Sequence, residues 1–401
     1  MAVILLTLVY MIPVGDIIRN MPESAKVVEQ EGVYYPVFSW CTSCVDNFSD
    51  SIILGTAAYR GTGTPLFEAM KCHCFWIHDT GPNDSFVAYY LRGVTNQAYG
   101  LQYARYWHGY LLFVKPLLTI FDLNGLRIVN GICQTVLSLV LVILMWNKGL
   151  KQQIIPYIIS LLMISPVANA MCLQFSHCFY AFTISSIMLV MILSKGGNER
   201  KVLFLFLYTG ILTSFLDLLS YPLISFGIPA IIYLDYNHND SSIKELFFKF
   251  VKAGICWCAG YAIMWFGKWV IGTIVTHESV FETAIGQAHG WTQGKNLWQV
   301  YFDNIYDFSR TPVLFIALAY IAVLFVLIIR NHCLEKVDFK IDILPFLVVG
   351  LLPFIWYAAI QTHSAVHHFF TYKSLMITAF SGLSMITSIY SKYSQLISPQ
   401  E

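Results

Sequence analysis

Long apolar runs recur along the chain, and most are close to the roughly 20 residues that a helix needs to cross a bilayer. Short polar stretches separate these runs. The pattern predicts an all-α integral membrane protein with about ten transmembrane helices. The predicted spans are 1–15, 126–146, 153–170, 174–194, 201–218, 220–235, 250–275, 312–330, 343–360 and 372–391.

Two of these spans are open to a second interpretation. No small-residue cleavage site follows the apolar run 1–15, which therefore indicates a membrane anchor and not a removed signal peptide. The run 220–235 contains Pro222, Gly227 and Pro229. It predicts either a full span or a re-entrant piece.

The composition agrees with a membrane protein. Of the 401 residues, 57% are hydrophobic and 12% are charged, whereas a soluble domain has roughly 25% charged residues. The net charge is +1 and the chain has no long basic run. Because nucleic-acid binding requires a basic surface, we expect no nucleic-acid partner.

The basic residues assign the connections between spans to two faces of the membrane. They occur in every second connection, and the positive-inside rule makes that face cytoplasmic. Both termini, including the tail 392–401, are then cytoplasmic. The extracytoplasmic face receives region 16–125 and the loops 276–311 and 361–371. The basic residues concerned are Lys148, Lys151, Lys195, Arg200, Lys201, Lys244, Lys249, Lys252, Arg330, Lys336 and Lys340.

Region 16–125 is far longer than an ordinary connection, which indicates a function or a small fold of its own. Its stretches 44–61 and 101–121 have apolar residues at helical spacing, and the second stretch breaks at Pro116. We expect these stretches to be amphipathic helices that lie along the membrane interface. Such helices can hold a lipid-linked substrate at the level of the head groups.

This order of segments resembles the GT-C superfamily of membrane glycosyltransferases: a first span, a long acidic outer region with interfacial helices, and a bundle with shorter outer loops. The phrases VDNFSDSIILGTAAY, ARYWHGYLLFVKPLL followed by GLRIVNG, GILTSFLDLLSYPLISFGIP and THSAVHHFFTYK are similar to stretches of bacterial proteins of this type. The resemblance covers most of the chain as architecture. It implies an enzyme of the bacterial plasma membrane whose active site faces the extracytoplasmic side.

The resemblance also implies the chemistry. The donor would be a polyprenyl-phosphate-linked sugar, the acceptor a cell-surface glycan or lipid, and the general base Asp50 or Asp46. A carboxylate within hydrogen-bond reach takes the proton of the attacking hydroxyl, and the departing phosphate needs cations and donors. These acids follow the first span by about thirty residues, so Asp16, directly after that span, is a rival. No cofactor is certain, and a divalent metal ion is compatible with this chemistry.

The same residues also have structural interpretations. Asp46 suits the N-cap of a helix that begins near Phe48, and Asp50 suits the dipole of its first turn. Arg105 and His108, in ARYWHGY, either bind the phosphate or acceptor or snorkel from an interfacial helix.

The stretch IQTHSAVHHFFTYKSLM gathers titratable residues between two apolar runs. His363 and His367 share a face if this segment is helical, and Tyr372 and Lys373 begin the next span. Because donors at this depth suit an anionic phosphate head group, the four residues are a candidate donor site. Three alternatives are two ligands of a metal ion, satisfied interface histidines and a proton relay.

Asp217 lies near the outer end of a predicted span, where a carboxylate is costly unless it is paired or lines a wet cavity. It is a candidate to orient a sugar or to pair with an arginine such as Arg127.

Four of the ten cysteines lie in region 16–125. An oxidising exterior favours disulfides that tie the two halves of this region, and a zinc site is the alternative. The pairing does not follow from one sequence. The four residues are Cys41, Cys44, Cys72 and Cys74.

Three functions are compatible with these observations: a membrane glycosyltransferase, a transporter or flippase of lipid-linked glycans, and a membrane-bound O-acyltransferase. A transporter places its polar groups near the bilayer midplane, and an acyltransferase with a histidine catalyst places that histidine deep in the bundle. Because the candidate residues cluster on one face, the sequence favours the glycosyltransferase.

Overall fold

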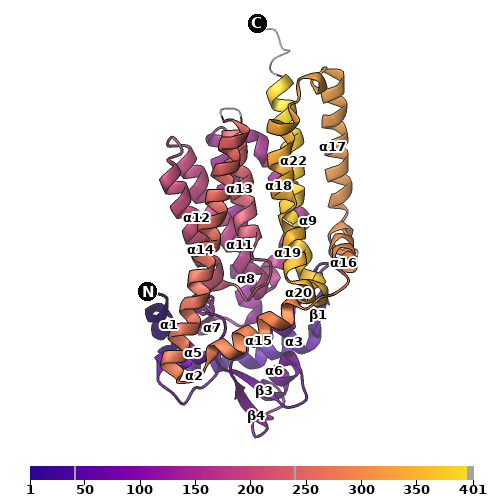
Figure 1. The fold of residues 1–401 in the computed structure, drawn as a ribbon. Helices are drawn as coiled ribbons and strands as arrows, with labels where there is room; N and C mark the ends of the chain where they lie inside the picture. The colour runs from indigo at the N-terminus through magenta and orange to yellow at the C-terminus, as the bar shows by residue number, and fades with distance from the viewer. Residues whose placement is uncertain (40–41, 239–240, 395–401) are drawn as a thin grey trace.

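The computed structural model describes residues 1–39, 42–238 and 241–394. Long helices run from the upper to the lower end of Figure 1, and residues 1–122 form a layer at the lower end, here called the lower layer. Six segments of the described chain are long and apolar enough to cross a membrane, so the protein is helical with membrane character. Four of them are single helices: α8 (Leu123–Asn147), α11 (Leu173–Leu193), α14 (Ile243–Thr276) and α17 (Val313–Arg330). The fifth, Phe339–Ala359, contains η3 (Phe339–Ile343), α18 (Leu344–Gly350) and α19 (Leu352–Ala359). The sixth, His368–Ser394, contains α21 (His368–Thr371), η4 (Tyr372–Leu375) and α22 (Met376–Ser394).

The expected count of ten spans is therefore not reached in the described chain. The run 153–170 is broken at Ser165, because Pro166 starts a new helix there. The shorter helices still belong to the bundle, where α12 packs against α14 and α13 against α11. These elements are η1 (Lys151–Gln153), α9 (Ile154–Met163), α10 (Pro166–Met171), α12 (Glu199–Leu216) and α13 (Ile224–Asn237).

The predicted first span is not confirmed. The run 1–15 contains only α1 (Ala2–Tyr10), which has 9 residues. At 1.5 Å per residue it is about 14 Å long, less than half the thickness of a bilayer core. Pro13 then becomes the N-cap of the next helix, and α1 packs against α5 (Pro65–Lys71) and α7 (Leu111–Leu118) within the lower layer.

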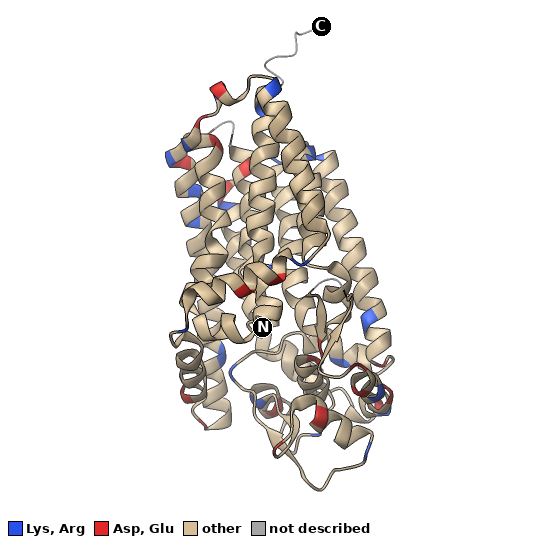
Figure 2. Cartoon of the chain, turned by 90° about the vertical axis from the view of Figure 1, so that its right-hand side faces the viewer, with Lys and Arg blue, Asp and Glu red and all other residues tan. Residues whose placement is uncertain are grey.

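The chain ends lie at opposite ends of the bundle as a result. Figure 1 shows α1 near the lower end, whereas α22 ends at the upper end. The expectation that both termini share one face of the membrane is not confirmed. Of the expected tail 392–401, the structure describes 392–394, which form the last residues of α22. Figure 2 shows that the charged residues gather toward the two ends of the bundle.

The lower layer contains two small antiparallel sheets among short helices. Tyr34 lies opposite Asp46 in the first sheet, and Cys74 lies opposite Leu101 in the second. The elements are α2 (Val14–Arg19), α3 (Met21–Glu31), β1 (Tyr34–Pro36), β2 (Cys44–Asp46), α4 (Asn47–Ala57), α5 (Pro65–Lys71), β3 (Cys74–Ile77), α6 (Pro82–Tyr90), β4 (Ala98–Leu101) and α7 (Leu111–Leu118).

The two expected interfacial helices differ from their prediction. The stretch 44–61 does contain a helix, α4, but most of α4 is buried in the lower layer. The stretch 101–121 is helical only at α7, whereas 102–110 is an irregular loop. His108 has a φ of 56° in this loop, and its ring nitrogens bond to Tyr103 O and Tyr110 Oη. These local side-chain bonds compete with a helix.

Three helices from the later part of the chain complete the lower end. α15 crosses this end, and α16 leads into α17 (Figure 1). α20 packs against both of them. Their bounds are α15 (Val280–Thr292), α16 (Leu297–Ser309) and α20 (Gln361–Val366).

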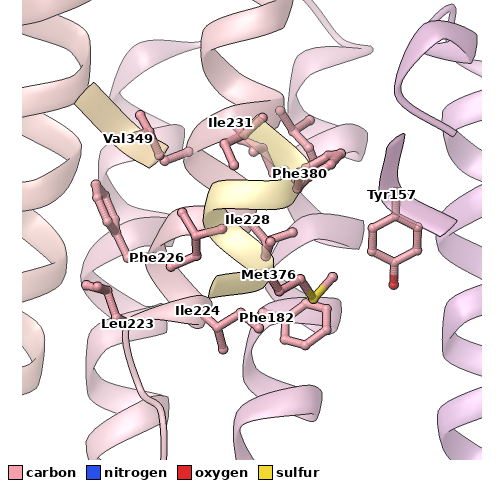
Figure 3. Close-up of a cluster of buried hydrophobic side chains, with 14 of the residues drawn as sticks. Tyr157, Phe182, Leu223, Ile224, Phe226, Ile228, Ile231, Val349, Met376 and Phe380 are labelled. Carbon is pink, nitrogen blue, oxygen red and sulfur yellow. The ribbon is translucent and has the colours of Figure 1, made fainter. Parts of the chain in front are cut away.

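The main core lies where α13 and α22 cross. Figure 3 shows Ile224 and Ile228 of α13 beside Met376 of α22, and Ile231 beside Phe380. All are buried. Since lipid is as apolar as these side chains, close packing rather than the hydrophobic effect stabilises such contacts in a membrane.

α12 and α14 approach each other even more closely. A Cβ atom on Gly210 would lie 2.1 Å from Trp257 O, and one on Gly260 would lie 2.1 Å from Leu207 O. Small residues let two helix backbones meet in this way. The crossing therefore requires glycine at both positions.

Lys268 fixes the lower layer to the bundle. It lies on α14, is fully buried, and donates to Ala69 O at 3.2 Å and to Met70 O at 3.0 Å. These carbonyls belong to the last turn of α5, which a cation stabilises.

The expected disulfides between the two halves of region 16–125 are absent at Cys72 and Cys74, which both have free thiols. The Cys72 thiol donates to Ala69 O at 3.1 Å, and Cys72 and Cys74 are buried. Cys41 lies outside the described residues.

Candidate functional site

A cavity of about 190 Å³ lies where α16 meets α17, opposite the break between α9 and α10. We call it the polar cavity after its charged and hydroxyl side chains, although most of its accessible lining is apolar. Side chains from four separate parts of the chain line it. They are Phe38, Thr42, Ser43, Leu162, Met163, Ser165, Pro166, Val167, Asp307, Arg310, Thr311, Val313 and Tyr372.

Asp307 is the carboxylate of the polar cavity. It lies in the last turn of α16 and is 6% exposed. One of its oxygens accepts a hydrogen bond from Thr42 Oγ1 at 3.2 Å, and the other lies 2.6 Å from Nδ1 of His368. The two contacts fix the orientation of a carboxylate that still borders the cavity.

Arg310 supplies a positive charge to the same wall. It is the C-cap of α16, so its backbone N–H bonds to Tyr306 O and Asp307 O. Its side chain is exposed, and the guanidinium lies 5.6 Å from the centre of the Tyr306 ring. In the described chain no ion pair joins Arg310 to Asp307. Arg310 can therefore bind an anion from the cavity.

Two buried hydroxyls of the polar cavity have unused hydrogen-bonding capacity. Ser43 is 1% exposed and Ser165 is 9% exposed. Neither hydroxyl has a hydrogen-bond partner among the residues that the structure describes. Ser165 also has a φ of 54°, an unfavourable backbone conformation for a residue with a Cβ. Buried polar groups without partners mark a site where a ligand can bond.

The opposite wall of the polar cavity is apolar and reaches the outside of the bundle. Leu162 is 42% exposed and Val167 is 47% exposed, while Met163 and Val313 lie deeper. One wall thus suits a polar head group and the other an apolar chain.

Tyr372 and Lys373 lie beside the polar cavity. Tyr372 lines it, and both residues are almost fully buried. Lys373 Nζ donates to Ile164 O at 2.9 Å and lies 4.8 Å from the centre of the Phe175 ring. Lys373 therefore ties the start of η4 to the end of α9.

A second cavity, of about 150 Å³, lies beneath α15. We call it the aromatic cavity. Arg105 is its one charged lining residue in the described chain. The lining consists of Arg105, Tyr106, Leu219, Tyr261, Trp265, Trp269, Ala284, Gln287, Ala288, Trp291, Thr292, Trp356 and Ile360.

His363 and His367 lie next to the aromatic cavity, not beside Lys373. Their ring centres are 4.9 Å apart and lie 5.1 and 5.4 Å from that of Trp291. Burial lowers the pKa of His363 to about 3 and that of His367 to about 4, so both are neutral at pH 7. The structure thus divides the expected donor site into two pairs.

A metal site at this histidine pair needs further ligands. Among residues 1–39, 42–238 and 241–394, no three His, Cys, Asp or Glu side chains come close enough to hold a metal ion. The pair therefore lacks the third protein ligand that a zinc site uses.

Asp50 caps the N-terminus of α11. It is fully buried, and its two oxygens accept the backbone N–H groups of Leu173 and Gln174, both at 3.1 Å. Burial raises its pKa to about 7, although the Arg127 charge and these two hydrogen bonds oppose the shift. Asp50 lines neither the polar nor the aromatic cavity.

Asp46 is the N-cap of α4, as its structural interpretation predicts. It accepts the backbone N–H of Ser49 at 3.1 Å and the Ser49 hydroxyl at 2.8 Å. Burial raises its pKa to about 6. Asp46 lines neither cavity.

The other expected acids also have protein partners. Asp16 forms an exposed ion pair with Arg19 at 3.1 Å. Asp217 accepts the backbone N–H of Ser220 and fixes the turn after α12. The expected pair of Asp217 with Arg127 is not formed, because Arg127 binds Glu31 at 2.7 Å.

His108 is unsuited to phosphate binding. It is fully buried and bonded on both ring nitrogens. Burial lowers its pKa to about 3, so it carries no positive charge at pH 7. It does not snorkel either, since its ring lies inside the lower layer and not at the surface.

The sequence does not predict Asp307, Arg310 or His368 as site residues. A local signal does exist for the first two, because YDFSR places an acid and an arginine directly before the apolar run 313–330. Nothing local connects Asp307 to His368, since 61 residues separate them. The tryptophans of the aromatic cavity were also missed, although Tyr261, Trp265 and Trp269 follow one another at intervals of four on α14.

Comparison with known proteins gives no relative: no family model, no curated protein and no solved structure matches the chain.

Proposed function

We propose that this protein is a membrane glycosyltransferase, which transfers a sugar from a polyprenyl-phosphate-linked donor to a hydroxyl of a cell-surface glycan or lipid. The observation that carries the proposal is the polar cavity, where Asp307 and Arg310 share one wall and an apolar wall reaches the outside of the bundle. A lipid-linked sugar phosphate complements these three features. Its sugar hydroxyls can bond to the polar side chains, its phosphate can pair with Arg310, and its apolar chain can lie on the apolar wall.

The reaction would occur at the extracytoplasmic face. The connections rich in Lys and Arg lie at the end of the bundle opposite the lower layer, and the positive-inside rule assigns them to the cytoplasm. The polar cavity lies near the lower layer and would then open outward.

Asp307 would act as the general base. The acceptor hydroxyl gives its proton to an Asp307 oxygen as the hydroxyl oxygen forms a bond to the anomeric carbon. The bond from that carbon to the phosphate oxygen breaks, and its electron pair leaves with the phosphate. His368 and Thr42 hold Asp307 in place through the contacts described above.

Arg310 would bind the phosphate of the donor. The departing phosphate gains negative charge in the transition state, and a guanidinium offers two parallel donors to it. The hydroxyls of Ser43 and Ser165 are free to bond to the sugar, since no described residue uses them.

We assign the base to Asp307 and not to Asp50. Asp307 lines the polar cavity, whereas Asp50 lines neither cavity and serves as the cap of α11. An acceptor hydroxyl would have to displace a helix cap to reach it.

The test is a transfer assay with the purified protein in vesicles that contain a polyprenyl-phosphate-linked radiolabelled sugar. Asp307→Asn should lower the rate roughly 10²–10⁴-fold, the range for loss of a general base. Asp303→Asn is the matched control, because Asp303 lies one turn earlier on α16 and bonds to Gln299 instead of lining the cavity. The proposal fails if the two variants have the same activity or if no donor lipid supports transfer.

Acyl transfer is the second candidate, and the contact between His368 and Asp307 favours it. A histidine oriented by a carboxylate is a common general base of acyl transfer, and His368 is 41% exposed at its side chain. Replacing the sugar donor by a radiolabelled acyl donor in the same vesicles separates the two functions.

A further inference from the structure

The aromatic cavity has no role in the reaction at the polar cavity, yet it has the features of a binding site. One face of α14 supplies Tyr261, Trp265 and Trp269 as a continuous stripe, with neighbouring ring centres 5.5 and 5.7 Å apart. α15 closes the cavity with Trp291, and α19 adds Trp356. Rigid aromatic walls with one polar anchor are typical of ligand sites.

The polar anchor is Arg105. Its guanidinium lies 4.3 Å from the centre of the Tyr103 ring and 5.4 Å from that of the Tyr106 ring. Its Nε atom is buried and has no hydrogen-bond partner in the described chain. None of the ion pairs among the described residues includes Arg105, and none of the lining residues is acidic.

The carboxylate of Asp217, two residues before the lining residue Leu219, is already in use. Its oxygens accept the Ser220 N–H group and lie 3.4 Å from the Cys178 sulfur. The cation thus borders a cavity with low polarity that contains no anion, where a carboxylate ligand would form a strong paired hydrogen bond.

The size and the walls define the rest of the ligand. A cavity of about 150 Å³ is the size that encloses a benzene ring, so it can receive the ring of a sugar but does not enclose all of its substituents. The ring faces of a pyranose carry C–H groups that pack on indole rings, and its hydroxyls have the Gln287 amide and the Thr292 hydroxyl within the same lining. A pyranose with a carboxylate therefore matches the walls and the anchor.

We propose that the aromatic cavity binds one hexuronic-acid residue of the acceptor glycan, an assignment that rests on the proposed function for the identity of the acceptor. The carboxylate pairs with Arg105, and the sugar ring packs between the indoles of α14 and Trp291. The cavity then selects an acidic glycan, while the polar cavity carries out the transfer.

Binding is tested by the tryptophan fluorescence of the full-length protein in detergent. Methyl glucuronide should give a saturable change, whereas methyl glucoside, which lacks the carboxylate, should give none at the same concentrations. Arg105→Met should weaken glucuronide binding at least about tenfold, the effect of losing a charged hydrogen bond. Trp291→Phe should reduce the amplitude of the change, and Trp298→Phe should not, because Trp298 is 81% exposed on α16.

Three results overturn the inference: equal binding of the glucoside and the glucuronide, tighter binding of glucose 6-phosphate than of the glucuronide, or unchanged glucuronide binding in Arg105→Met. Melting curves show whether each variant is folded, and Trp291→Phe gives an independent readout if Arg105→Met is not. Glucuronide binding without any sugar transfer contradicts the proposed function alone. Sugar transfer to neutral acceptors without glucuronide binding contradicts this inference alone.

Discussion

Asp307 Oδ2 and His368 Nδ1 lie 2.6 Å apart, and this contact joins the end of α16 to His368, the first residue of the last described segment that is long and apolar enough to cross a membrane. In the proposed reaction His368 does not touch the substrate. It positions the carboxylate that does.

The role of His368 can be separated from a purely structural one by kinetics. His368→Phe should lower kcat about tenfold and leave the KM for the donor unchanged, because one hydrogen bond to Asp307 is lost. His368→Gln keeps an N–H donor and should recover most of the activity. A parallel rise of KM, or equal losses in the two variants, would show that His368 has another role.

The crossing of α12 and α14 predicts a strong dependence on glycine. Gly210→Ala and Gly260→Ala should each destabilise the protein by about 1–3 kcal/mol, the usual cost of overpacking, since each new Cβ would lie 2.1 Å from a backbone oxygen. Gly267→Ala is the control on α14, because nothing lies within 4 Å of its Cβ position. Thermal unfolding in detergent measures the difference, and equal melting of all three variants would refute the crossing.

Asp50 makes a prediction about pH. Its pKa is about 7 in the folded protein against an ordinary value of 3.8, so between these values the folded state holds a proton that the unfolded state has lost. Stability therefore falls as the pH rises through this window, and the loss is complete above pH 7. The full effect is up to about 4 kcal/mol, at 1.36 kcal/mol per pKa unit.

The Asp50→Asn variant lacks this titration. Its free energy of unfolding, relative to that of the wild type, should increase between pH 5 and pH 8. Asp16→Asn should show no such change, because Asp16 is in an exposed ion pair. A constant difference between the melting temperatures of Asp50→Asn and the wild type across this pH range would show that the Asp50 pKa is not raised by burial.

Lys373 should affect stability more than donor binding. Its ammonium is buried and donates to Ile164 O, so Lys373→Met should cost about 1.5–3 kcal/mol, typical of a charged hydrogen bond. Lys26→Met, which removes an exposed pair with Glu23, should cost no more than about 1 kcal/mol. A stable Lys373→Met protein with a raised KM for the donor would instead support direct phosphate binding by Lys373.

Cys72 and Cys74 should be found as thiols by mass spectrometry. Both are free and buried, so an alkylating reagent should modify them after denaturation without any reductant, and hardly at all before it. A need for reductant before these two residues react would indicate the disulfides that the sequence predicts.

The membrane character follows from the sequence because it depends on the lengths of apolar runs, which are a local property. The N-cap role of Asp46 is local for the same reason. The apolar composition of a run does not predict where a helix within that run ends. The run 1–15 contains Pro13, which starts a new helix there, and the run 153–170 is broken by Pro166.

The candidate site was less predictable because its contacts connect distant parts of the chain. Asp50 reaches the N-terminus of α11 across 123 residues, and Thr42 reaches Asp307 across 265. Asp50 was a candidate because of its charge alone. The structure shows that Asp50 caps α11 and that Asp307 lines a cavity. The adjacency of His363 and His367, which follows from a spacing of four, was predictable.

The contact of Lys268 with α5 has a consequence for the order of folding. The ribosome makes the lower layer before α14 and α16, so its α5 carbonyls receive this cation only after about 200 further residues have been added, and Asp307 reaches Thr42 later still. Until then the layer lacks partners from α14 and α16. If the layer lies outside the membrane, it is translocated early and waits in an incomplete state, where its unpaired surface is open to a chaperone on that side.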